Sequence, residues 1–174
     1  MQAGVGGLLV LLTRAQLGLL PPRLWAGLRM GSAAGAVTAT AIAATTSVPA
    51  VRRSMSERDL PASVPGWLVV WIPVGTVWAE EAAFRGALAT AGAAAFGKSG
   101  GRLLQAAAFG LSHIPDARAM GEPAVATVAA TGIGGWLFGW IADRSGSLAA
   151  PLLVHLAINE AGALAALAVQ RRLR

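Results

Sequence analysis

The segment Glu80-Glu81-Ala82-Ala83-Phe84-Arg85 places three charged side chains in a stretch, residues 67–96, that has no other ionisable group. A charge at bilayer depth costs roughly 2.5–3.5 kcal/mol on insertion scales, so a charge that is kept there usually has a function and a partner. This feature constrains the fold, because other helices must supply polar groups that compensate these charges.

The composition indicates a membrane protein. The chain has 174 residues, of which 55% are hydrophobic and 13% charged, and its mean hydropathy is +0.61. Soluble domains carry about 25% charged residues. We therefore expect an all-α, polytopic membrane helix bundle of five to six transmembrane segments that enclose a polar cavity. The chain contains no cysteine, which excludes a disulfide framework and thiolate chemistry.

The positive charge is not evidence for nucleic-acid binding. The formal net charge is +6, but the basic residues flank apolar runs and form no stripe on a soluble face. Their bias towards arginine, together with the many alanines and glycines, is typical of a GC-rich genome. We expect an integral protein of a bacterial plasma (inner) membrane, whose partners are the lipid bilayer and a peptide or protein substrate at the membrane, with no nucleic acid.

The chain divides into two parts. Residues 1–30 predict a short N-terminal span or interfacial helix, because Arg14 follows the apolar run, unlike the basic start of a secretory signal. Residues 31–174 predict the membrane-embedded bundle, with a Gly-rich turn at 98–102. Its apolar runs are 31–51, 65–96, 103–114, 124–142 and 147–169. The pairs Gly31/Gly35 and Gly135/Gly139 have the spacing that lets helix backbones approach closely in lipid.

The only two histidines each have a partner one helical turn away. Phe109 and His113 share one helix face, and His155 and Asn159 share another. Together with the acidic motif they form three polar clusters on three separate helices. Such clusters are unfavourable in an apolar environment unless they meet and bond to one another. We therefore expect all three to line a single cavity.

The acidic motif separates its two carboxylates. Glu81 precedes Arg85 by four positions, the favourable order for an ion pair on one helix face. Glu80 is rotated about 100° from Glu81 on an α-helix, so the two carboxylates cannot both use Arg85. Glu80 is therefore left for other chemistry, and a carboxylate next to an imidazole suits general-base activation of water.

The order EExxxR, FxxxH and HxxxN on successive membrane helices resembles the CPBP family. This is the CAAX protease and bacteriocin-processing (Abi) group of intramembrane proteases, which includes the CAAX prenyl protease 2-like enzymes. The motifs match without a departure over residues 80–159. The resemblance implies an intramembrane endopeptidase in which Glu81 and Arg85 orient the site and Phe109 packs beneath it.

The resemblance also implies roles for the remaining motif residues. Glu80 with His113 would activate the attacking water. His155 and Asn159 would stabilise the oxyanion of the tetrahedral intermediate. An imidazole and a carboxamide suit this second role, since both can donate hydrogen bonds to developing negative charge.

The sequence does not firmly imply a cofactor. Members of the family have been described as metalloproteases and as glutamate-type proteases. If zinc is present, its ligands are Glu80, His113 and His155, with water in the fourth position. The spacing lacks the compact H-E-x-x-H arrangement of zinc proteases, and we therefore favour metal-free activation of water.

Each motif taken alone also fits a structural role. The acidic motif resembles an ion-pair cluster, His113 a helix-end cap, and His155 with Asn159 a packing pair between helices. Two other functions stay open: a catalytically silent membrane scaffold or immunity-type protein, and a small proton-coupled transporter with Glu80 as the proton carrier. The coincidence of all three motifs favours catalysis.

Overall fold

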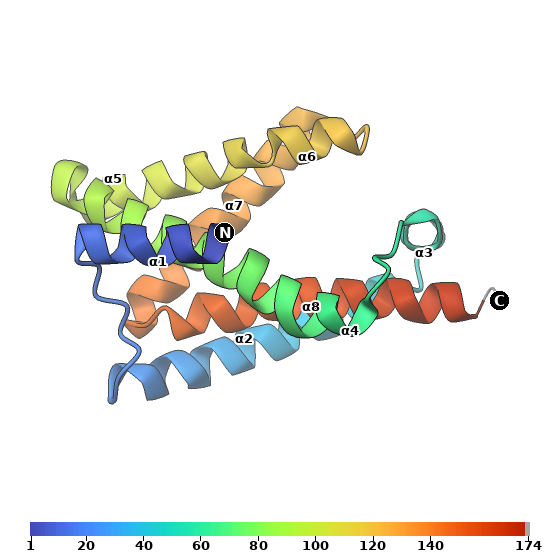
Figure 1. Ribbon diagram of the computed structural model, residues 1–174, viewed down its shortest axis with the longest axis horizontal. Coiled ribbons are helices and arrows are strands. Elements are labelled where there is room, and N and C mark those ends of the chain that lie inside the picture. Colours follow the sequence, from blue (N-terminus) through green and yellow to red (C-terminus); the bar gives the residue numbers. More distant parts are fainter. Residues whose placement is uncertain (173–174) are drawn as a thin grey trace.

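The computed structural model describes residues 1–172, and these residues form a bundle of helices without a β-strand (Figure 1). The helices are α1 (Gln2–Thr13), α2 (Arg23–Thr45), α3 (Pro49–Glu57), α4 (Val64–Gly66), the π-helices η1 (Trp67–Trp78) and η2 (Glu81–Leu88), α5 (Ala89–Ser112), α6 (Ile114–Ala119), α7 (Ala124–Ser145) and α8 (Ala149–Arg171). The predicted all-α bundle is confirmed. Residues 173 and 174 of the predicted bundle lie outside the described residues.

The bundle has the surface of a membrane protein. Helices α7 and α8 are each long and apolar enough to cross a bilayer, and α2 with α3, bent by 94°, makes a third span only if the pair is taken as one. Large apolar side chains are exposed on the outside, among them Val37, Val69, Trp71 and Val125. Such a surface suits lipid rather than water. The count of five to six segments and the bacterial plasma membrane stay predictions.

Two boundaries differ from the expected ones. Helix α2 runs across the predicted division between residues 30 and 31, and that division stays a prediction. The predicted turn at 98–102 is wrong in its position, because Lys98 and the residues after it are helical. The break in α5 lies at Gly97, which has φ 73° and ψ 170°. Glycine adopts this conformation readily because it has no Cβ.

Glycines bring the long helices into close contact. Gly27, Gly31 and Gly35 are the buried residues of α2, spaced one turn apart. A Cβ on Gly31 would lie 2.8 Å from the carbonyl oxygen and 2.9 Å from the Cα of Ala150 in α8. Helices α2 and α8 therefore pack backbone against backbone, as small residues at this spacing allow in lipid.

The remaining helices surround the acidic motif. Helix α1 lies across η2 (Figure 1), with Gly6 facing the carbonyl of Ala79. Helix α5 packs along α7. One apolar cluster joins α7 to α8 through Phe138, Ile141, Ala150 and Val154, and a second joins η1 to α8 through Ile72, Val77 and Ala163. Together these helix contacts place η2, α5, α7 and α8 around the acidic motif.

We expect Gly31→Ala to destabilise the bundle. Its Cβ would press on the backbone of Ala150, and overpacking of this kind costs about 1–3 kcal/mol. This exceeds the helix-propensity gain of about 1 kcal/mol from replacing glycine. Gly134→Ala is the matched control, since no atom lies within 4 Å of its added Cβ. Thermal unfolding in detergent should show a lower midpoint for Gly31→Ala alone, and equal midpoints would contradict the contact.

Candidate active site

The acidic motif lies where the chain is wound as a π-helix. Glu80 precedes η2, Glu81 is its first residue, and η1 before them contains Pro73, which has no N–H to donate. A π-helix bonds residue i to i+5, so successive side chains rotate by less than on an α-helix. The expected separation of about 100° between the two carboxylates assumed α-helical winding, which ends at Glu80. Both carboxylates approach the same histidine.

Glu81 is the central acceptor of the cluster. Its Oε1 lies 3.1 Å from Nη1 of Arg85, and neither side chain has exposed surface. The same oxygen lies 2.8 Å from Nδ1 of His155, which comes from α8. The Arg85–Glu81 ion pair expected from the four-residue spacing is thus present. Its charges are close, although the guanidinium N–H groups are not aligned with the carboxylate as a hydrogen bond requires.

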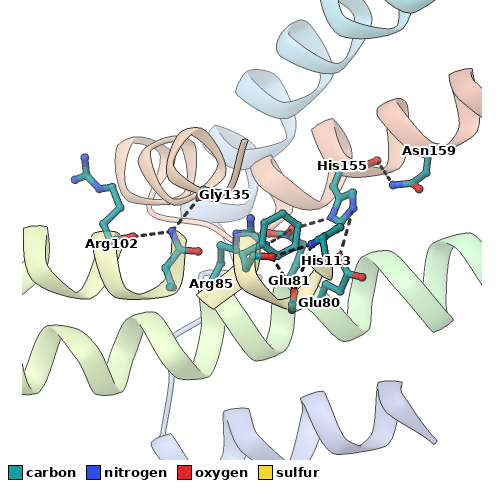
Figure 2. Close-up of polar contacts among 11 residues, drawn as sticks. Glu80, Glu81, Arg85, Arg102, His113, Gly135, His155 and Asn159 are labelled. Atoms are coloured by element: carbon teal, nitrogen blue, oxygen red, sulfur yellow. Dashed lines mark hydrogen bonds and ion pairs between the residues drawn. The ribbon is translucent and has the colours of Figure 1, made fainter. Parts of the chain in front are cut away.

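Glu80 faces the other nitrogen of the same ring. Its Oε2 lies 3.7 Å from Nε2 of His155, too far for a direct hydrogen bond. The side chain of Glu80 is 30% exposed, whereas that of Glu81 is fully buried. His155 therefore lies between a buried carboxylate that holds it and a partly exposed carboxylate (Figure 2).

Aromatic rings bring the second histidine to this cluster. The ring of Phe109 packs edge-on against His113 at 4.7 Å and against His155 at 6.2 Å between centroids. The guanidinium of Arg85 lies 4.0 Å from the centroid of the same phenyl ring. This distance allows a cation–π attraction, which is strong where water is excluded. The resemblance implied that Phe109 packs beneath the site, and the ring lies between both histidines and Arg85.

A backbone contact orients His113. Its Nδ1 lies 2.8 Å from the carbonyl oxygen of Phe109, one turn earlier in α5. Because a carbonyl only accepts, we assign the proton of the neutral imidazole to Nδ1. Nε2 of His113 is then a hydrogen-bond acceptor, which is the form that a general base requires.

Asn159 lies one turn beyond His155 on α8, and its amide is directed along its own helix. Its Nδ2 donates to the backbone carbonyl of His155 at 3.1 Å (Figure 2). The structure thus brings together Glu80, Glu81, Arg85, His113 and His155. Asn159 is adjacent to this group and bonds to the backbone that carries His155.

Two further residues support the cluster and were not predicted from the sequence. Phe138 of α7 packs 5.2 Å from the ring of His155 and 4.9 Å from the guanidinium of Arg85. Gln105 is fully buried and donates to the carbonyls of Arg102 and Gly135, which connects α5 to α7. Gln105 could have been singled out from the sequence, because it is the one amide side chain in the apolar run 103–114. Phe138 could not have been singled out in this way, because it is one of many apolar residues in α7.

The conditional zinc set has no support in this arrangement. Within residues 1–172, no three side chains of His, Asp or Glu are grouped as metal ligands. Nδ1 of His155 is bonded to Glu81, and Nδ1 of His113 to a carbonyl. Each histidine has one ring nitrogen left, and these do not form a ligand group with Glu80.

A comparison with protein-family models identifies the family. The model described as type II CAAX prenyl endopeptidase Rce1-like matches residues 62–161, more than half of the chain, and this range includes all three motifs. The chain belongs to this family. The Rce1-like family is a group of CAAX proteases that act on peptide or protein substrates at the membrane. No curated protein and no solved structure matches the chain.

We expect Arg85→Met to destabilise this Rce1-like protein strongly. Removing one partner of a buried ion pair leaves an uncompensated charge and costs roughly 3–5 kcal/mol. The double variant Glu81→Gln with Arg85→Met should recover part of this loss, because it no longer buries a lone carboxylate. Thermal unfolding of both purified variants checks the result. A single variant that is as stable as the wild type would contradict the importance of the pair.

Proposed function

We propose that the chain is an intramembrane endopeptidase that hydrolyses a peptide bond near the membrane with water activated by Glu80 and His113. The observation that supports this best is the arrangement around His155, with Glu81 on one ring nitrogen and the accessible Glu80 facing the other. Membership of the Rce1-like family supports the class of reaction.

Glu80 and His155 can share one oxygen atom. Oε2 of Glu80 and Nε2 of His155 lie 3.7 Å apart, so one oxygen atom can lie within hydrogen-bond distance of both. Glu80 is partly exposed, which gives water and a peptide access to its carboxylate. We assign Glu80 as the base that takes a proton from the attacking water, with Nε2 of His113 as the second acceptor.

His155 is the proposed oxyanion donor. Glu81 accepts from its Nδ1, and a proton on Nε2 would face Glu80. A donor role for Nε2 requires a proton on each ring nitrogen, because Nδ1 already donates to Glu81. A hydrogen bond to a developing oxyanion in such a site contributes about 2.7–4 kcal/mol. Asn159 is a proposed second donor, whose amide must turn away from the His155 carbonyl to act.

The proposed reaction has no covalent intermediate. The oxygen of the activated water bonds to the peptide carbonyl carbon, and the proton that it loses passes through Glu80 or His113 to the leaving nitrogen. The C–N bond then breaks to give a carboxylic acid and an amine. The neighbouring hydroxyl of Ser112 donates to the carbonyl of Phe109, so it is not activated as a nucleophile.

We expect Glu80→Gln to abolish proteolysis while the fold is kept. Loss of a general base typically lowers the rate 10²–10⁴-fold. Glu122→Gln is the matched control, because Glu122 precedes α7 and is exposed. Substrates are first identified as membrane peptides that accumulate in cells lacking the gene, and cleavage is then measured with purified protein. Normal cleavage by folded Glu80→Gln would favour a scaffold, and a pH-gradient-dependent flux lost in this variant would favour a transporter.

We expect the rate of cleavage to be independent of added metal. Glu80, His113 and His155 activate water and stabilise the oxyanion in this proposal without a metal ion. Purified protein treated with a chelator should therefore cleave its substrate at the untreated rate, with no change when zinc is added back. A rate that falls with the chelator and returns with zinc would overturn the metal-free assignment and leave the endopeptidase class intact.

A further inference from the structure

A second polar feature lies behind the catalytic cluster. A groove of about 620 Å³ reaches Arg85 from the side of the segment after α1, of α5 and of the α7–α8 turn. Its polar lining residues, besides Arg85, are Gln16, Arg23, Thr90, Lys98, Asp143 and Ser147. Neither Glu80 nor the two histidines are among its lining residues, so this groove is distinct from the proposed substrate site.

The groove lies at a boundary between membrane and water. Helix α7 ends at Ser145 and α8 begins at Ala149, and both helices are candidate spans, so the turn between them lies at one bilayer surface. Arg23 begins α2 on the same side, and Lys98 directly follows the break at Gly97. The same end of the bundle is seen in Figure 1, where α1 and the start of α8 lie below the end of α5 that contains this break.

The walls of the groove have an excess of positive charge. Asp143 is the acidic residue among its lining residues, and it is held by Arg102 at 2.7 Å and by Lys98 at 3.7 Å. Arg23 has only a long contact, 3.4 Å, with the neutral amide of Gln16. Arg23 and Lys98 therefore supply more positive charge than Asp143 neutralises, and the N-terminal end of α8 adds a positive dipole end.

Arg85 lies beneath the groove. Its side chain has no exposed surface, and it lines both the groove and a smaller adjoining cavity of about 50 Å³. Its Nε and both Nη atoms have no aligned hydrogen-bond partner within residues 1–172. Its charge is compensated by Glu81 and by the rings of Phe109 and Phe138, so the groove ligand must be recognised by the other basic residues of the lining.

We propose that this groove binds the phosphate group of an anionic phospholipid. Arg23 and Lys98, which line the groove, contact the headgroup. The apolar part of the lining, which includes Leu17, Ala89 and Leu148, accommodates the glycerol and the start of the acyl chains. A soluble phosphate would share the charge but would make no use of these apolar walls or of the position at the bilayer surface.

The test measures lipid binding by the full chain. Purified protein in detergent is given phosphatidylglycerol or phosphatidylcholine, and the retained lipid is measured by native mass spectrometry. We expect phosphatidylglycerol to be preferred, and Arg23→Gln and Lys98→Gln each to weaken its binding about fivefold, as expected for one basic residue near a charged headgroup. Arg52→Gln is the matched control, because Arg52 lines a different groove between α2 and α8.

The outcomes separate the sources of the phosphate. Equal loss in Arg23→Gln and Arg52→Gln would show general attraction to anionic lipid and overturn a specific site. Inorganic phosphate that displaces phosphatidylglycerol at millimolar concentration would assign the groove to a soluble anion and overturn the lipid assignment. Two variants are used so that a folding defect in one, detected by thermal unfolding, leaves the other informative. Binding is measured without proteolysis, so the result is independent of the proposed function.

Discussion

The ion pair between Glu81 and Arg85 is the interaction on which the site depends. Both side chains are fully buried, and a lone charge in that position would be strongly unfavourable. Glu81 also holds His155, so the pair connects η2 to α8. The charges therefore stabilise the arrangement of helices only when both helices are in place, and the same contact that offsets the burial of Arg85 orients the imidazole.

Small residues make this arrangement sterically feasible. A Cβ on Gly135 would lie 3.0 Å from the ring of Phe109 and 3.3 Å from Nη2 of Arg85, so glycine lets α7 pack directly against them without displacing either side chain. The guanidinium is then enclosed by Phe109 and Phe138, whose ring faces attract a cation. A neutral apolar wall would not compensate the charge of Arg85 as well.

Charged groups are buried inside this bundle and large apolar side chains are exposed on its outside, the reverse of a soluble protein. Charged side chains gather between η2, α5 and α8, whereas large apolar side chains such as Trp71 and Val125 are exposed on the outside. Hydrolysis within such a bundle needs a polar group that water can reach. Glu80 meets this need because its side chain is partly exposed while its neighbour Glu81 is not. One position in the chain thus separates a fully buried carboxylate from the partly exposed one that is proposed to react.

The sequence by itself determined the helical membrane fold, the three motifs and the Arg85–Glu81 pair. These follow from apolar run length and from four-residue spacing, which are local properties. The tertiary structure decided which groups meet: both carboxylates on one imidazole, Phe138 and Gln105 beside them, and the amide of Asn159 on its own helix. Local spacing assumes regular α-helical winding and carries no information on which faces of distant helices pack together. The π-helical winding of η1 and η2 departs from that assumption, and only packing between helices specifies which faces meet.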